Sequence, residues 1–219
     1  RNKRPKAELT SGIDGSEYYI KHPLDSAFSK LKNPEAVFNV TGNYAFYSTL
    51  DGIKGTVKHI DFKRHLGNSA SITITEPPAE KYSGQGPYSL INGVIGSEEK
   101  YGGSEWLGFD GKDFEAEITW QTVQAVSSIS MRFFNGQGQW IYLPSQVEMF
   151  AKDAGGNFKL ISSMKHMPSN TKVAKLIAVT PELQTETIRI KASNFGIIPE
   201  GNQGAGHKSW LFVGEIEIK

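Results

Sequence analysis

The stretch Ser128-Ile-Ser-Met-Arg-Phe133 decides the fold class, because apolar and polar side chains alternate along it. Alternation with a period of two places the apolar side chains on one face of a β-strand. The same pattern recurs on both sides of this stretch, at residues 71–75, 116–120, 147–150, 187–191 and 210–218. Turn-forming pairs such as Asp110-Gly111 and Asn135-Gly136 separate the runs. No long segment carries a helical stripe, so the sequence predicts an all-β sandwich or jelly roll.

Composition excludes several classes of function. Lys and Arg number 24 and Asp and Glu 23, giving a formal charge of +1, whereas proteins that grip nucleic acid need a clustered basic surface. The basic run from Arg1 to Lys6 is expected to be a solvated tail. The absence of cysteine excludes a thiol nucleophile and a disulfide framework. No apolar run approaches the ~20 residues of a membrane helix, so we expect no membrane insertion. The balanced charge and the terminal position of the basic run predict no nucleic-acid partner.

The chain is expected to contain two domains, with a boundary near Leu66-Gly67-Asn68. Residues 1–67 hold short strand-like runs at 18–20, 37–40, 44–47 and 57–62, which fit a small immunoglobulin- or fibronectin-like sandwich. Residues 68–219 continue as strands to the last residue. Because the chain begins at Arg1 without a methionine or an apolar leader, we expect it to be a piece of a longer polypeptide.

An ordered series of segments follows Ser71, including Leu90-Ile-Asn-Gly93, Trp106-Leu-Gly-Phe109, Trp140-Ile-Tyr-Leu-Pro144 and Trp210-Leu-Phe-Val213. In order and spacing they resemble the discoidin-like domain (coagulation factor 5/8 C type, similar to carbohydrate-binding module family 32) that follows the catalytic region of bacterial β-N-acetylhexosaminidases, or chitobiases. The resemblance implies a discoidin-type jelly roll of the galactose-binding kind over residues 68–219. Residues 1–67 more weakly resemble the small fibronectin-like domain that precedes it in such enzymes.

In the resembling fold, sugar sites lie on loops at one end of the sandwich, here residues 96–105, 135–142 and 194–209. Neutral sugars are held by flat aromatic faces and by polar groups that bond their hydroxyls. The candidates on these loops are Glu98, Tyr101, Asn135, Gln137, Trp140, Tyr142, Asn194, His207, Lys208 and Trp210. Tyr101, between Lys100 and Gly102-Gly103, is the best aromatic platform. Trp106 and Phe109 are expected in the core, and Trp210 is favoured as a plug of the barrel end.

No cofactor follows from the residues themselves. The resemblance implies a structural calcium near Asn92, Ser97 and Glu215, in which Glu215 matches a glutamate close to the last strand. Asn92 stands where an acidic ligand is common, so one carboxylate remains instead of two. Fewer carboxylates lower the affinity for a hard cation, which weakens this prediction.

Motifs for catalysis are weak throughout the sequence. Glu115 and Glu117 lie two apart on a predicted strand and share one face, and Glu98-Glu99 are adjacent, so neither pair offers the opposed carboxylates of a glycosidase. None of the five histidines has metal-ligand spacing. Residues 201–209 resemble a phosphate-binding loop, but the β-like run from Trp210 leaves no helix to bind phosphate.

The leading hypothesis is therefore a non-catalytic carbohydrate-binding module, accessory to a secreted or surface glycoside hydrolase of β-N-acetylhexosaminidase type. Its expected partners are a galactose- or N-acetylhexosamine-containing glycan and the catalytic domain of the same polypeptide, outside the cytoplasm (periplasmic, cell-surface or secreted). The alternative is a structural spacer or docking domain that binds no sugar. A third hypothesis, an independent hydrolase, predicts turnover by this chain alone, and we expect none.

Overall fold

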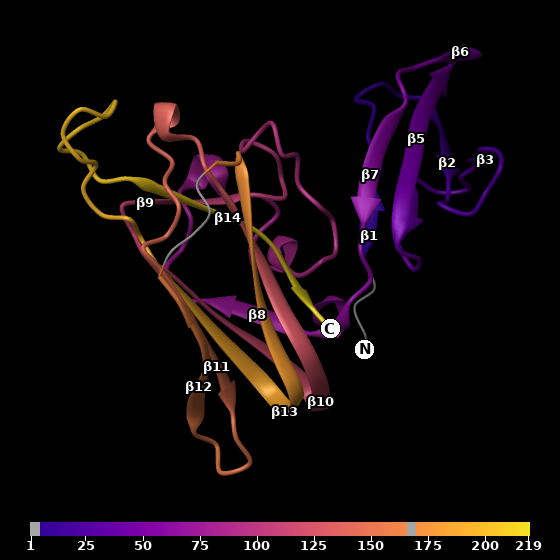
Figure 1. Ribbon diagram of the computed structural model, residues 1–219. Coiled ribbons are helices and arrows are strands. Elements are labelled where there is room, and N and C mark those ends of the chain that lie inside the picture. Colours follow the sequence, from indigo (N-terminus) through magenta and orange to yellow (C-terminus); the bar gives the residue numbers. More distant parts are fainter. Residues whose placement is uncertain (1–4, 166–169) are drawn as a thin grey trace.

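The computed structural model describes residues 5–165 and 170–219, which form strands joined by turns and short 3-10 helices (Figure 1). The N-terminal part contains β1 (Lys6–Glu8), β2 (Glu17–Lys21), β3 (Ser29–Lys30), β4 (Glu35–Val37), β5 (Gly42–Leu50), β6 (Ile53–Lys54) and β7 (Lys58–Phe62). The C-terminal part contains η1 (Leu66–Ser69), β8 (Ser71–Ile74), η2 (Glu80–Tyr82), η3 (Pro87–Leu90), β9 (Leu107–Asp110), β10 (Phe114–Phe134), η4 (Gln137–Gln139), β11 (Gln146–Lys152), β12 (Phe158–Met164), β13 (Val173–Ser193) and β14 (Trp210–Ile218). The all-β prediction is confirmed.

Two long antiparallel strands, β10 and β13, build both layers of the C-terminal sandwich and run side by side in Figure 1. The first half of β10 pairs with β8 on one side and with the second half of β13 on the other. The second half of β13 pairs in turn with β11, and β11 pairs with β12. The second half of β10 pairs with the first half of β13 and with β14, and β14 pairs with β9. Register shifts between Thr119 and Gln124 and between Val126 and Ser128 mark the change of layer. Bulges of this kind bend a strand, so one strand serves two sheets.

The core of the jelly roll follows the alternation seen in the sequence. Ile129, Met131 and Phe133 of β10 are each 0% exposed and pack in the main cluster between the layers. Trp106 and Phe109 are 0% and 1% exposed, which confirms their expected burial. Full burial of a side chain of this size contributes about 1.5–3 kcal/mol, so the sandwich is held mainly by these inward faces.

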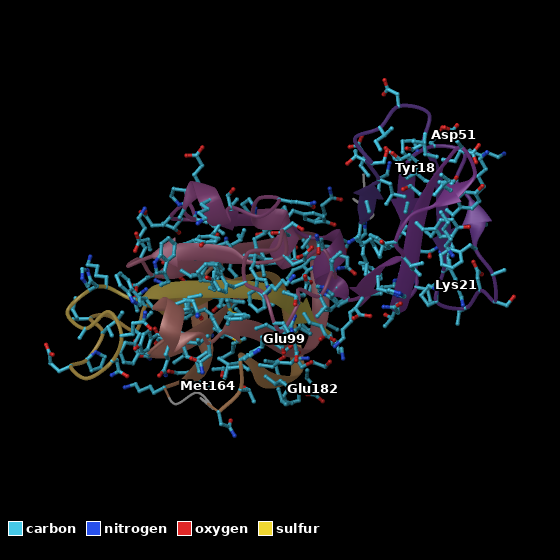
Figure 2. The ribbon with its side chains drawn as sticks, turned by 90° about the horizontal axis from the view of Figure 1, so that it is seen from above. Tyr18, Lys21, Asp51, Glu99, Met164 and Glu182 are labelled. Carbon is cyan, nitrogen blue, oxygen red and sulfur yellow. The ribbon has the colours of Figure 1, made fainter. Side chains whose placement is uncertain are left out.

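A separate hydrophobic cluster lies in the N-terminal part, the indigo-to-purple ribbon at the right of Figure 2. Tyr44 and Phe46 of β5 pack there with Ile20, Phe38 and Phe62, all buried. The pairing order of the sheet is β3-β2-β5-β6, with β7 also on β5, while β1 and β4 pair as a second, two-stranded sheet. The domain boundary at residue 67 and the fibronectin-like assignment stay predictions.

The end of β7 is joined to the C-terminal part by backbone hydrogen bonds. Phe62 forms an antiparallel bridge with Val94, which also packs against the N-terminal cluster. The Lys63 amide donates to the Gly93 carbonyl at 2.7 Å, and the Ile95 amide donates to the Asp61 carbonyl at 2.9 Å. Segment 93–95 of the C-terminal part therefore pairs with the end of β7, and Val94 packs against the N-terminal cluster.

In the described ranges, no helix is long and apolar enough to cross a membrane. Residues 1–4 of the basic run and His166 lie outside the described residues.

Candidate functional site

The predicted loops gather at one end of the jelly roll, the upper end in Figure 1. The loop after β10 is tied to the start of β14, because the Trp210 amide donates to the Trp140 carbonyl at 2.8 Å and the Tyr142 amide to the Trp210 carbonyl at 3.0 Å. The loop before β9 is fixed by Trp106, whose Nε1 donates to the Ser97 carbonyl at 3.1 Å. These bonds preform the loop end.

A second, smaller hydrophobic core supports these loops from below. Trp106, Phe134, Ile141 and Phe212 are buried in it, and Tyr82, Tyr101, Val173 and Trp210 pack around them. The Tyr101 ring meets Phe134 at 5.4 Å and Phe212 at 5.1 Å between centroids, both edge to face. Such pairs add about 0.5–1.5 kcal/mol beyond area burial, so the half-buried Tyr101 ring is held in place.

Next to Tyr101 lies a hollow of about 370 Å³, which we call the Tyr101 hollow. Its lining is Glu99, Tyr101, Phe134, Asn135, Gly136, Gln139 and Lys172. Glu99 and Lys172 form an ion pair, and both side chains are well exposed. Gly136 allows the close approach of neighbouring groups, since a Cβ there would lie 3.0 Å from Gln139 Oε1 and 3.3 Å from the Phe134 ring. The hollow thus combines an aromatic wall, two amides and one pair of opposite charges.

Two of the predicted sugar-binding residues, Tyr101 and Asn135, line this hollow together. The Asn135 amide donates to the Lys172 carbonyl at 2.7 Å, and its Nδ2 donates to the Thr171 carbonyl at 3.2 Å. Sequence reasoning missed Gln139 and Lys172 and noted Glu99 only as half of an acidic pair. Gln139 lies two residues after Gln137 in a loop already expected to bind sugar, so it could have been predicted from the sequence. No pattern points to Lys172, because only the fold brings it there.

Glu98 and Asn194 make contacts within the protein. Arg132, whose side chain is 7% exposed, donates to Glu98 at 2.9 Å. Asn194 Nδ2 donates to the Ser209 carbonyl at 3.0 Å, and its Oδ1 accepts from the Gly196 amide and Ser209 Oγ, both at 2.8 Å. These bonds close the base of loop 194–209. Gln137 and Lys208 are exposed on the same end.

Three aromatic candidates pack within the loops in this arrangement, one of them on His207. Trp140 is half-buried and stacks on the exposed His207 ring at 4.9 Å and 17°. Tyr142 is 5% exposed and lies 4.8 Å from Phe195, so its ring face is covered. Trp210 is half-buried against Tyr82, at 5.4 Å between centroids. A part for these residues in sugar binding stays a prediction.

The residues expected to hold calcium hydrogen-bond to groups of the protein. Asn92 Oδ1 accepts from the Val94 amide at 2.8 Å, and Ser97 Oγ accepts from the Glu99 amide at 3.1 Å. Glu215 Oε1 accepts from His65 Nε2 at 2.7 Å and from the Gly93 amide at 2.9 Å. Burial raises the pKa of the Glu215 carboxyl. Within residues 5–165 and 170–219, no three acidic, histidine or cysteine side chains form a group that could hold a metal.

The phosphate-loop-like segment and the acidic pair Glu115 and Glu117 show no geometry for phosphate binding or hydrolysis. Residues 201–209 form turns that lead into β14, so no helix terminus is present there. Glu117 accepts from Arg189 Nε at 2.9 Å, and Glu115 lies 3.2 Å from Lys191 Nζ on the same sheet face. These carboxylates are paired with basic side chains on the neighbouring strand β13.

No protein-family model matches the sequence, and no curated protein matches it. Among solved structures, a Ruminococcus gnavus GH29 fucosidase in complex with fucose is 18% identical, with a TM-score of 0.46 over 72% of this chain and 26% of that chain. A GH31 CBM32-2 bound to GalNAc is 14% identical, with a TM-score of 0.46 over 68% and 97% of the two chains. A family 32 module from Clostridium perfringens NanJ in complex with galactose is 14% identical, with a TM-score of 0.45 over 69% and 94%.

This chain therefore spans about a quarter of the length of the fucosidase. At such identities and TM-scores the likenesses support no conclusion about a ligand.

Proposed function

We propose that this chain is a non-catalytic glycan-binding module and that the Tyr101 hollow is its site. The observation that carries the proposal is the lining of the hollow, where a fixed aromatic ring stands beside two amides and one ion pair. A volume of about 370 Å³ lies at the lower end of the range for small-molecule sites, about 300–1,000 Å³. One sugar ring is a ligand of suitable size.

The charges of the hollow favour a neutral polyhydroxylated ligand. Glu99 and Lys172 neutralise each other, so neither an anion nor a cation gains net attraction. A hydroxyl group both donates and accepts, and it can therefore bond to the carboxylate and the ammonium at once. The Tyr101 ring offers an apolar surface to sugar C–H groups. The exposed Gln139 side chain adds an amide that can both donate and accept.

The same lining argues against hydrolysis at this site. Glycosidases of the common type place two carboxyl groups about 5–10 Å apart across the scissile bond. Glu99 supplies the single carboxylate among the residues that line the hollow, and Lys172 pairs with it. A single carboxylate cannot serve both as the general acid and as the nucleophile or base of such a reaction.

In finer detail, we propose a galactose- or N-acetylhexosamine-containing glycan as the ligand. The sequence resemblance further supports a parent hydrolase of β-N-acetylhexosaminidase type that acts outside the cytoplasm, with its catalytic domain as the partner in the same polypeptide.

The test is calorimetric titration of the purified chain with galactose, N-acetylgalactosamine and chitobiose, repeated with Tyr101→Ala. We expect a saturable signal with at least one sugar and a loss of about tenfold or more in affinity for the variant, equivalent to about 1.4 kcal/mol. Phe195→Ala is the matched control, since Phe195 is an exposed aromatic at the same end but outside the hollow. Equal loss in both variants would contradict the assignment of the site.

A structural spacer is the second candidate function. It is favoured by the internal contacts of Tyr142 and Asn194, which leave fewer loop groups for a ligand than the sequence predicted. A folded chain that gives no signal on a broad glycan array would favour this reading.

A further inference from the structure

Glu215 carries the most deeply buried carboxyl group of the jelly roll. It hydrogen-bonds to His65, which lies 150 positions earlier in the sequence. The side chains of His65 and Glu215 are 0% and 1% exposed. An ionised carboxylate this far from water is very unfavourable unless it is paired and hydrogen-bonded. Something must therefore compensate Glu215 from within the fold or from a bound ion.

The surrounding contacts determine which ring nitrogen of His65 carries the hydrogen. Nδ1 accepts from the Gly67 amide at 3.1 Å and from the Ile218 amide at 3.2 Å. A nitrogen that accepts two amide hydrogens has none of its own, so the ring hydrogen is on Nε2. Nε2 then donates to Glu215 Oε1 at 2.7 Å. The ring is aligned from one side by backbone and from the other by the carboxylate.

The rest of the environment supplies charges of both signs. Glu215 lines a cavity of about 130 Å³ together with Lys63, Arg132 and Lys175. Two acidic side chains of the same lining, Glu98 and Glu217, are paired with these cations. The three cationic groups are matched by Glu98, Glu215 and Glu217, so a divalent cation placed here would add positive charge that no further carboxylate of the lining balances.

We propose that His65 takes the place of a metal ion as the partner of Glu215, so that this jelly roll is stable without a divalent cation. The bond also fastens the junction before η1 to the last strand, across 150 positions of sequence. This inference does not depend on the glycan site, because none of its residues lines the Tyr101 hollow.

The test begins with the unaltered chain. Its melting temperature is measured by calorimetry in EDTA and in excess CaCl₂, and Ca²⁺ is titrated into metal-free protein. We expect the two melting temperatures to agree and the titration to give no binding heat. A site filled to 100 times its Kd would raise the melting temperature by about 5–10 °C. Such a rise, or saturation at one ion per chain, would overturn the proposal.

Two variants then test the role of the imidazole. His65→Ala leaves Glu215 without its Nε2 donor, and we expect the melting temperature to fall by about 10 °C. His65→Gln places an amide N–H near the position of Nε2, and we expect it to recover at least half of that fall. A stable His65→Ala variant, or a glutamine variant no better than alanine, would contradict the role given to this hydrogen. If His65→Ala does not fold, the calcium measurements on the unaltered chain still decide the question.

Discussion

Trp140 adopts a positive φ of 64°, a conformation that is uncommon for a residue with a bulky side chain. The stack on His207 and the close packing of Gly204 hold it there. A Cβ at Gly204 would lie 2.5 Å from the Trp140 indole, too close for any side chain without movement. Gly204 is therefore required for two reasons, its own φ of +84° and its contact with the ring.

At this scale we expect Gly204→Ala to destabilise the chain more than Gly201→Ala. Both glycines have a φ near +85°, but a Cβ at Gly201 meets nothing within 4 Å. The alanine variants share the backbone cost, of about 1–2 kcal/mol. Overpacking adds about 1–3 kcal/mol at Gly204 alone. Urea unfolding monitored by tryptophan fluorescence measures the difference, and equal losses would show that the loop moves freely away from Trp140.

At the scale of elements, the hairpin of β11 and β12 depends on one carboxylate. Asp153 Oδ1 accepts from the amides of Asn157 and Gly155, both at 2.9 Å, and Lys159 Nζ lies 3.1 Å from Oδ2. These contacts, led by the Asn157 amide and then Lys159, hold the pKa of Asp153 below its usual value. The turn residues 153–157 thereby close the two strands.

This shift predicts how the hairpin responds to acid. Because the folded pKa is lowered, the stabilisation is present above the unfolded value of about 3.9 and is lost as the pH falls through the folded pKa. Asp153→Asn keeps an oxygen acceptor but has no charge to titrate. We expect the melting temperatures of the two proteins to differ at pH 6 and to converge towards pH 2.5. Curves that stay parallel over this range would remove Asp153 from the acid response.

Strands could be predicted from the sequence where one face is buried, but their lengths could not. Alternation located residues 116–120 and 128–133 as two separate runs, whereas both belong to the single strand β10. The connecting residues carry bulges, and a register shift leaves no period of its own in the sequence. Tyr101 and Asn135, which line the Tyr101 hollow, could be named from the sequence as candidates, whereas Lys172 could not. Its position depends on where β13 begins beside β10.

At the scale of the whole molecule, the predicted boundary at residue 67 separates His65 from Glu215 and Phe62 from Val94, yet both pairs are in contact. Segment 93–95 adds backbone bonds to the end of β7 and places Val94 against the N-terminal cluster. Contacts that join two parts of a fold couple their stabilities. A boundary predicted from the sequence does not reveal this coupling, because the contacts join positions far apart in the chain.

We therefore expect the unaltered chain to unfold in one calorimetric transition and Val94→Asp to unfold in two. A carboxylate at this half-buried position would lose water without a partner and weaken the N-terminal cluster, whereas the main core lies elsewhere. The earlier transition should fall about 5 °C or more below the later one. Val40→Asp provides the control, since Val40 is 38% exposed in the same N-terminal part. Two transitions already present in the unaltered chain would mean that the clusters fold independently and that the contacts at residues 62–65 join them only weakly.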